Sequence, residues 1–199
     1  MKKIRLFLFL ISMLSVAALI NSFYFPTGQA SKEVRGIIDS DIIWSKSNSP
    51  YILTAPLSVK NGITLTIEPG VTINLNSYYI QVNGTLVAKG TSANLIQFKG
   101  DGAIKFTEAS KSWNGQSGVG CIIENANVSL VYIQINDASP KINLSFFDSG
   151  IGIDGGSPII SNNIIQTFGM GSVIDVAKGS PLIFGNDFST KRLNVTTYK

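Results

Sequence analysis

The chain has 199 residues, of which 44% are hydrophobic and 14% are charged, and this composition excludes an intrinsically disordered protein. Lys2, Lys3 and Arg5 are three of its 16 basic residues, so the other 13 nearly balance the 12 acidic ones and exclude a basic nucleic-acid-binding surface. One cysteine and no histidine exclude an intrachain disulfide and remove the commonest general base and metal ligand.

Residues 1–30 contain the three regions of a secretory signal peptide. A basic start precedes an apolar run over residues 6–20, and Gly28-Gln29-Ala30 offers small side chains for cleavage after Ala30. The alternative is an uncleaved helical anchor, because the apolar stretch extended to Phe25 is long enough to span a bilayer. Both interpretations predict a signal helix and a body outside the cytoplasm, secreted or at the cell surface, with membrane contact through this segment only.

The rest of the chain divides into a short cap and a repetitive body. Residues 31–50 mix polar and apolar side chains, include Trp44, and are predicted to form an N-terminal cap before the first strands. Residues 51–199 have a hydrophobic period of two, as in Ile63, Leu65 and Ile67, with Gly, Asn, Ser or Pro between short runs. The pattern predicts an all-β body of short strands and tight turns.

The short runs also recur at long range. Ser-Pro begins at residues 139, 157 and 180, spaced by 18 and then 23 residues. An Ile follows each proline by two positions, and Asn163 and Asn186 match Ser145. A period near 20 predicts a right-handed parallel β-helix, a β-solenoid of about six or seven coils with asparagine ladders at its turns. A β-sandwich is the alternative, but it does not account for the register of the repeats.

The most distinctive segment of the body is LTIEPGV at residues 65–71. It is accompanied by Trp44, Ser49–Tyr51, Val82–Leu86, Ile96–Phe98, Phe106-Thr107, Trp113 and Cys121–Ala126. Together these residues resemble right-handed parallel β-helix domains of archaeal and bacterial surface proteins, and the Ser-Pro copies resemble the repeats of the same families. The resemblance implies the fold much more than a function, because many relatives have no assigned activity.

The acidic residues form no evident catalytic constellation. Members of β-helix families include polysaccharide lyases and hydrolases, and a glycosidase needs two carboxylates about 5 to 10 Å apart. Asp154 and Asp175 are 21 residues apart, so stacking of coils could align them, and they are the best candidate pair. Solvated charges at turns or edges explain both residues more simply. We therefore expect no catalytic residues, no metal and no cofactor.

Three aromatic residues are candidates for contact with sugar rings. Tyr78 and Tyr79 point to opposite faces if they lie in a strand, so at least one is expected to be exposed. Trp113 lies in the loop-rich segment KSWNGQSGVG. The alternative for all three is packing under loops. Ligand-binding candidates are thus these aromatic residues together with Asp154 and Asp175.

The sequence favours an exported or cell-surface module with a structural or interaction role and no catalysis. The alternative is a carbohydrate-active protein, either a polysaccharide-binding domain or a lyase or hydrolase. Expected partners are a surface polysaccharide or another surface protein chain, and not nucleic acid. The tail after Phe188 has the pattern of an edge strand, which predicts an exposed last coil. Four sequons begin at Asn83, Asn127, Asn143 and Asn194.

Overall fold

The computed structural model describes residues 31–166 and 173–188, so the predicted signal segment 1–30 and the tail from residue 189 lie outside the described residues. The described chain is built of β-strands, which confirms the predicted all-β class, with one 3-10 turn at Lys46–Asn48. None of its helices is long and apolar enough to cross a membrane. The strands are β1 (Lys32–Ile38), β2 (Ile42–Trp44), β3 (Tyr51–Val59), β4 (Thr64–Ile67), β5 (Thr72–Asn74), β6 (Tyr79–Val82), β7 (Thr85–Lys89), β8 (Ile96–Phe106), β9 (Ile122–Glu124), β10 (Ala126–Asn136), β11 (Lys141–Asn143), β12 (Phe146–Phe147), β13 (Ile151–Asp154), β14 (Ile159–Ser161), β15 (Ile164–Ile165), β16 (Ile174–Lys178) and β17 (Leu182–Phe184).

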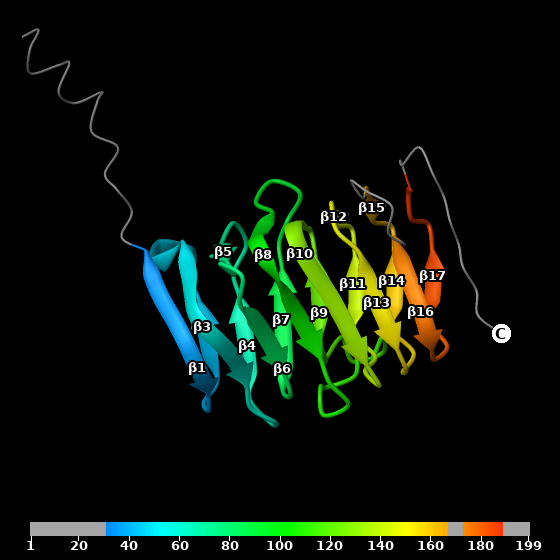
Figure 1. The fold of residues 1–199 in the computed structure, drawn as a ribbon, viewed down its shortest axis with the longest axis horizontal. Coiled ribbons are helices and arrows are strands. Elements are labelled where there is room, and N and C mark those ends of the chain that lie inside the picture. The colour runs from blue at the N-terminus through cyan, green and yellow to red at the C-terminus, as the bar shows by residue number, and fades with distance from the viewer. Residues whose placement is uncertain (1–30, 167–172, 189–199) are drawn as a thin grey trace, which may run out of the picture. The chain divides into compact units, whose positions relative to one another are not determined.

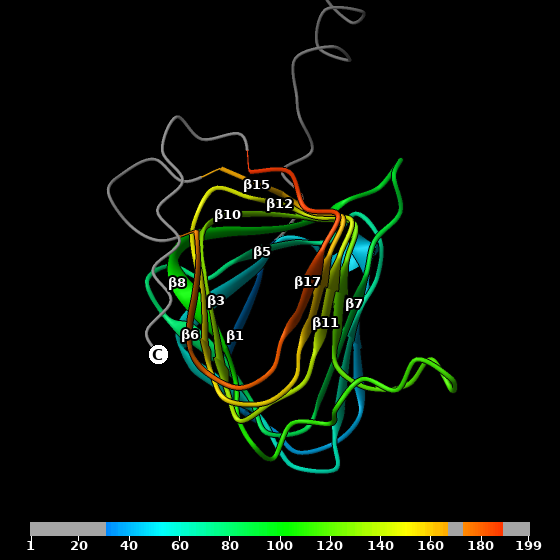
Figure 2. The same cartoon turned by 90° about the vertical axis from the view of Figure 1, so that its right-hand side faces the viewer.

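The strands pair in parallel within two sheets (Figure 1). A seven-stranded sheet has the order β17-β14-β11-β9-β7-β4-β2, and a ten-stranded sheet follows β1-β3-β5-β8-β10-β12-β15 with β6, β13 and β16 beside this path. Each passage of the chain adds strands to the ten-stranded sheet and then one strand to the seven-stranded sheet, so the seven strands mark seven coils in the described residues. Figure 2, turned by 90°, shows these coils one behind another. Parallel stacking of this kind fits a β-solenoid.

Inward side chains from every coil form one apolar core between the sheets. Ile, Val, Leu and Phe dominate this core, as expected where stacked strands bury one face. Fully burying one such side chain contributes about 1.5–3 kcal/mol. The residues predicted to lie inside are all at most 1% exposed, which confirms the inward pattern: Ile67, Ile73, Val82, Phe98, Ile133 and Ile160.

The structure confirms the register read from the Ser-Pro repeats. Ile142 of β11 lies opposite Ile160 of β14, which lies opposite Ile183 of β17. In the next strands, Phe147 lies opposite Ile165. Residues 18 and 23 positions apart therefore become neighbours, because the length of the coil varies while the inward column is kept.

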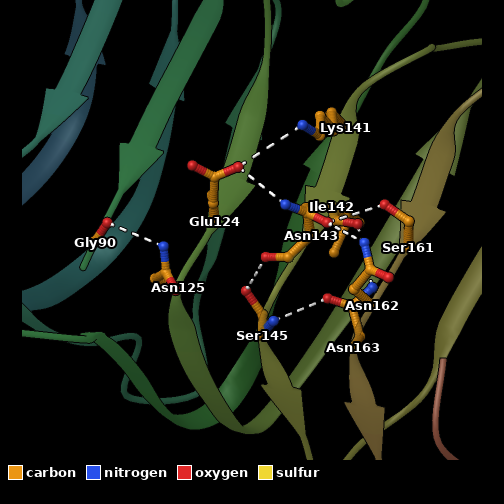
Figure 3. A network of polar contacts seen from close by, with 10 residues as sticks. All are labelled: Gly90, Glu124, Asn125, Lys141, Ile142, Asn143, Ser145, Ser161, Asn162 and Asn163. Carbon is orange, nitrogen blue, oxygen red and sulfur yellow. Dashed lines mark hydrogen bonds and ion pairs between the residues drawn. The ribbon is translucent and has the colours of Figure 1, made fainter. Parts of the chain in front are cut away.

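A polar ladder follows the corner where the seven-stranded sheet gives way to the ten-stranded one (Figure 3). The Ala126 N–H donates to Ser145 Oγ at 3.1 Å, and the Ser145 N–H donates to Asn163 Oδ1 at 3.0 Å. The Asn163 N–H in turn donates to Asn186 Oδ1 at 3.0 Å. Side chains thus satisfy backbone groups that the sharp corner removes from the sheets, and the predicted asparagine ladder is confirmed.

The segment 31–50 differs from its prediction as a cap that precedes the strands. It contains β1 and β2, which pair in parallel with β3 and β4, so it forms the first coil. Its alternation is weak because no described strand covers the outer edge of this coil. Trp44 is 1% exposed and stacks on Tyr51 with ring centroids 4.5 Å apart, closing the core at this end.

Candidate functional site

The five candidate residues belong to two regions of the structure, the ten-stranded sheet and the loop beside the seven-stranded sheet. Tyr79 is in β6, Asp154 in β13 and Asp175 in β16, all in the ten-stranded sheet, and Tyr78 immediately precedes β6. Trp113 lies in the long loop between β8 and β9, before the chain enters the seven-stranded sheet. The structure therefore places Tyr79, Asp154 and Asp175 on the outer face of the ten-stranded sheet, Tyr78 at its border and Trp113 on another surface.

The outward residues of β6, β8, β10, β13 and β16 form a surface that we call the tyrosine face. Tyr79 lies opposite Ala103 of β8, and Ala103 lies opposite Tyr132 of β10. The two tyrosines thus occupy the same outward column, two strand steps or about 10 Å apart. The surface between the two tyrosines is low, because the Ala103 side chain there is a single methyl group.

Tyr132 is the functional candidate that sequence analysis did not single out. It is 41% exposed, and its hydroxyl reaches Gly152 of β13, where a Cβ atom would collide with the tip of the ring. Burial and, to a smaller extent, the charge of Asp175 raise the pKa of the Tyr132 hydroxyl, so it stays protonated at neutral pH. The contact with Gly152 holds the Tyr132 ring across β13.

Tyr79 and Tyr78 border a shallow hollow at the start of the same face. The Lys105 ammonium lies 4.3 Å from the centroid of the Tyr79 ring, as in a cation–π contact. Tyr78 packs against the core, and both Tyr78 and Tyr79 are partly buried. The hollow, of about 320 Å³, is lined by both tyrosines, Ser77, Asp101, Gly102, Ala103 and Lys105.

Asp154 and Asp175 lie on neighbouring strands but not opposite each other. Asp175 is the register partner of Gly152, whereas Asp154 is the partner of Lys178, because the register shifts after Ile153. Asp154 Oδ1 and Lys178 Nζ are 3.0 Å apart in an exposed ion pair. Within the described residues, no group of three or more acidic or cysteine side chains could hold a metal ion. Asp154 thus has a lysine partner and Asp175 faces Tyr132.

A second surface lies over the seven-stranded sheet, where the loop 107–121 rises beside β4, β7 and β9. A groove of about 490 Å³ runs between loop and sheet, with Thr64, Thr85, Lys89 and Lys111 among its lining residues. The Trp113 ring has Lys89 Nζ at 5.2 Å and Lys141 Nζ at 5.4 Å from its centroid.

The lysines around Trp113 have acidic neighbours. Glu124 is the register partner of Lys89, lies 3.7 Å from Lys141 Nζ, and also accepts from Asn143 (Figure 3). Glu124 therefore offsets part of the positive charge around Trp113.

Cys121 anchors the end of this loop inside the core. It is fully buried, and its thiol lies 3.5 Å from the Gly84 carbonyl oxygen. Burial raises the pKa of this thiol to about 11, so the residue behaves as a small hydrophobic group.

Three of the four sequon asparagines already use their amide nitrogens. Asn83 donates to Ser58 Oγ at 3.1 Å, Asn127 to Gln97 Oε1 at 3.0 Å, and Asn143 to Glu124 Oε2 at 3.0 Å. A glycan at any of them would replace one of the two hydrogens of this nitrogen and leave the other for the bond. The fourth sequon, at Asn194, lies outside the described residues.

Comparison with known proteins gives one partial similarity. No family model matches the chain, and no solved structure matches it. A segment of 65 residues, 32% of this chain, is 43% identical to Protein bark beetle of Drosophila melanogaster. The segment corresponds to 2% of that protein, so the similarity is local and does not assign the chain to a family.

Proposed function

We propose that this chain is an exported module, built as a right-handed parallel β-helix, that works by binding at its outer surface rather than by catalysis. The right hand follows the strong preference of parallel connections. The observation that supports binding is the tyrosine face, where Tyr79 and Tyr132 stand in one column of stacked strands.

Rigid strands make such a surface suited to recognition. Side chains held by a continuous sheet lose little conformational entropy when they bind, and half-exposed tyrosines offer apolar area with a polar tip. The acidic candidates support binding over hydrolysis, because Asp154 is paired with Lys178 rather than with a second carboxylate.

The test is to incubate the purified full-length chain with neutral and acidic polysaccharides and to measure both retention and new sugar ends. We expect retention on at least one polymer and no release of products. Reproducible turnover that disappears in Asp154→Asn or Asp175→Asn would overturn the proposal, because it would assign these carboxylates to chemistry.

A second candidate function is carbohydrate recognition or processing at the loop groove. It is favoured by the Trp113 ring beside Lys89, which lines the groove together with Thr64 and Thr85. Under this alternative, Trp113→Ala would abolish binding to a polysaccharide while Tyr132→Ala would leave it intact.

Export is a proposal about residues 1–30. Mass spectrometry of the mature protein should find Ser31 at its N-terminus if the signal is cleaved after Ala30. Recovery of the intact N-terminus in the membrane fraction would indicate the anchor instead.

A further inference from the structure

We propose that the tyrosine face binds a neutral, extended β-1,4-linked glycan that crosses the strands, with sugar rings stacked on Tyr79 and Tyr132. The inference rests on the proposed function and gives its binding surface a ligand class. It is carried by the spacing of the two tyrosine positions along their column, the contact of Tyr132 with Gly152, and the charge balance of the face.

The spacing of the tyrosines selects the shape of the ligand. They lie in one column with Ala103 between them, about 10 Å apart. In an extended β-1,4-linked chain, successive sugars are turned over, so the same ring face recurs with every second sugar, over a similar length. Two tyrosines anchored in this column can therefore offer their rings to two sugars that are one disaccharide apart, with the intervening sugar over Ala103 and the second sugar toward β13, where the Tyr132 ring lies.

Tyr132 is seated so that it can act as a platform. The ring tip occupies the space that Gly152 leaves by lacking a Cβ atom, and Asp175 is the residue opposite Gly152 on the next strand. Gln134, two residues along β10, lies opposite Lys105 in the neighbouring column. A sugar on Tyr132 would thus meet an amide, an ammonium and a carboxylate, which are suitable partners for its hydroxyls.

The charges of the face favour a neutral ligand. Lys99, Lys105 and Lys178 are balanced by Asp101, Asp154 and Asp175, and the Asp154–Lys178 pair is closed at 3.0 Å. A polyanion or polycation would meet as much repulsion as attraction here. The Lys105 side chain lies over Tyr79, and its flexible end can move aside and donate to a hydroxyl once a sugar occupies the ring.

The test measures binding of the full-length chain to insoluble cellulose and chitin by depletion, and to cellohexaose and chitohexaose by calorimetry. Binding to cellulose would identify the ligand as a polymer of unsubstituted hexoses, and binding to chitin would identify it as a polymer of N-acetylhexosamines. Starch tests the linkage, and polygalacturonate tests the charge. Tyr132→Ala should weaken binding about ten-fold, whereas Tyr132→Phe should retain it, because stacking needs the ring and not the hydroxyl.

Two further variants test the geometry without removing a ring. Gly152→Ala pushes the Tyr132 tip from its seat and should weaken binding, and Ala103→Leu fills the gap between the rings and should weaken it also. Gly115→Ala, in the loop 107–121 with no heavy atom closer than 4.0 Å to the added methyl group, is the control and should bind like the wild type. Thermal unfolding followed by circular dichroism verifies that each variant is folded.

Three results would overturn the inference. They are no binding to any neutral β-1,4-linked glycan, preference for starch or polygalacturonate, and wild-type affinity in folded Tyr132→Ala. Each differs from failure of the proposed function, which would be seen as cleavage of a polymer. Binding without cleavage that depends on Tyr132 supports both.

Discussion

Removal of the Asn163 side chain tests how much the corner ladder stabilises the fold. Asn163 is 1% exposed, accepts from the Ser145 N–H at 3.0 Å, and donates to the Ile142 carbonyl at 3.1 Å. In Asn163→Ala both backbone groups lose these bonds where water cannot easily replace them. Each unsatisfied buried polar group costs about 1–3 kcal/mol, so the two groups together predict a loss of about 2–6 kcal/mol in the free energy of unfolding.

The matched control is Asn136→Ala, because Asn136 is a partly exposed strand residue with no side-chain hydrogen bond to the described part of the chain. Urea unfolding followed by circular dichroism compares the two variants, and amide exchange reads the Ser145 N–H directly. We expect faster exchange at Ser145 in Asn163→Ala only. Equal unfolding free energies for the two variants, within about 0.5 kcal/mol, would refute the view that the ladder stabilises the corner.

Three further predictions concern stability. Leu144 has a strained positive φ of 51° at the corner position where neighbouring coils have Asn125 and Asn162. Leu144→Asn should therefore stabilise the fold by about 1 kcal/mol in urea unfolding, and a loss of stability would contradict this strain. Gly84→Ala places a methyl group against two backbone carbonyl oxygens and should cost about 2–4 kcal/mol, whereas Gly115→Ala, with no heavy atom closer than 4.0 Å, should leave the melting temperature unchanged. Folding raises the pKa of Cys121 from 9.0 to about 11, so the stability that the protonated thiol contributes is present below pH 9 and is lost as pH rises towards 11. Cys121→Ala should reduce this loss of stability at high pH, and an unchanged dependence of stability on pH would contradict the prediction.

The repeats could be predicted because the repeated positions are residues that face inward or form turns. Ile142, Ile160 and Ile183 occupy one column, and the Ser-Pro steps before them reveal it despite unequal coil lengths. The first coil could not be recognised in the same way. Its strand β1 carries Lys32, Glu33 and Arg35, since side chains at the end of a stack are partly exposed and their pattern is correspondingly weak.

The candidate site was harder to predict, because it depends on register between strands far apart in sequence. Asp154 and Asp175 are separated by nearly one repeat, yet the shift after Ile153 places Lys178 opposite Asp154. Tyr132 stands 53 residues after Tyr79, and only the pairing through β8 places them in one column. The small residue at Gly152 could have been noticed, but its role requires knowing which ring lies against it.

The most direct measurement of the account is an experimental structure of the chain with a neutral β-1,4-linked hexasaccharide. We predict parallel coils wound with a right hand, an intact ligand that crosses β6, β8 and β10, and sugar rings stacked on Tyr79 and Tyr132. Left-handed coils, cleaved sugar, or a ligand bound only beside Trp113 would contradict it.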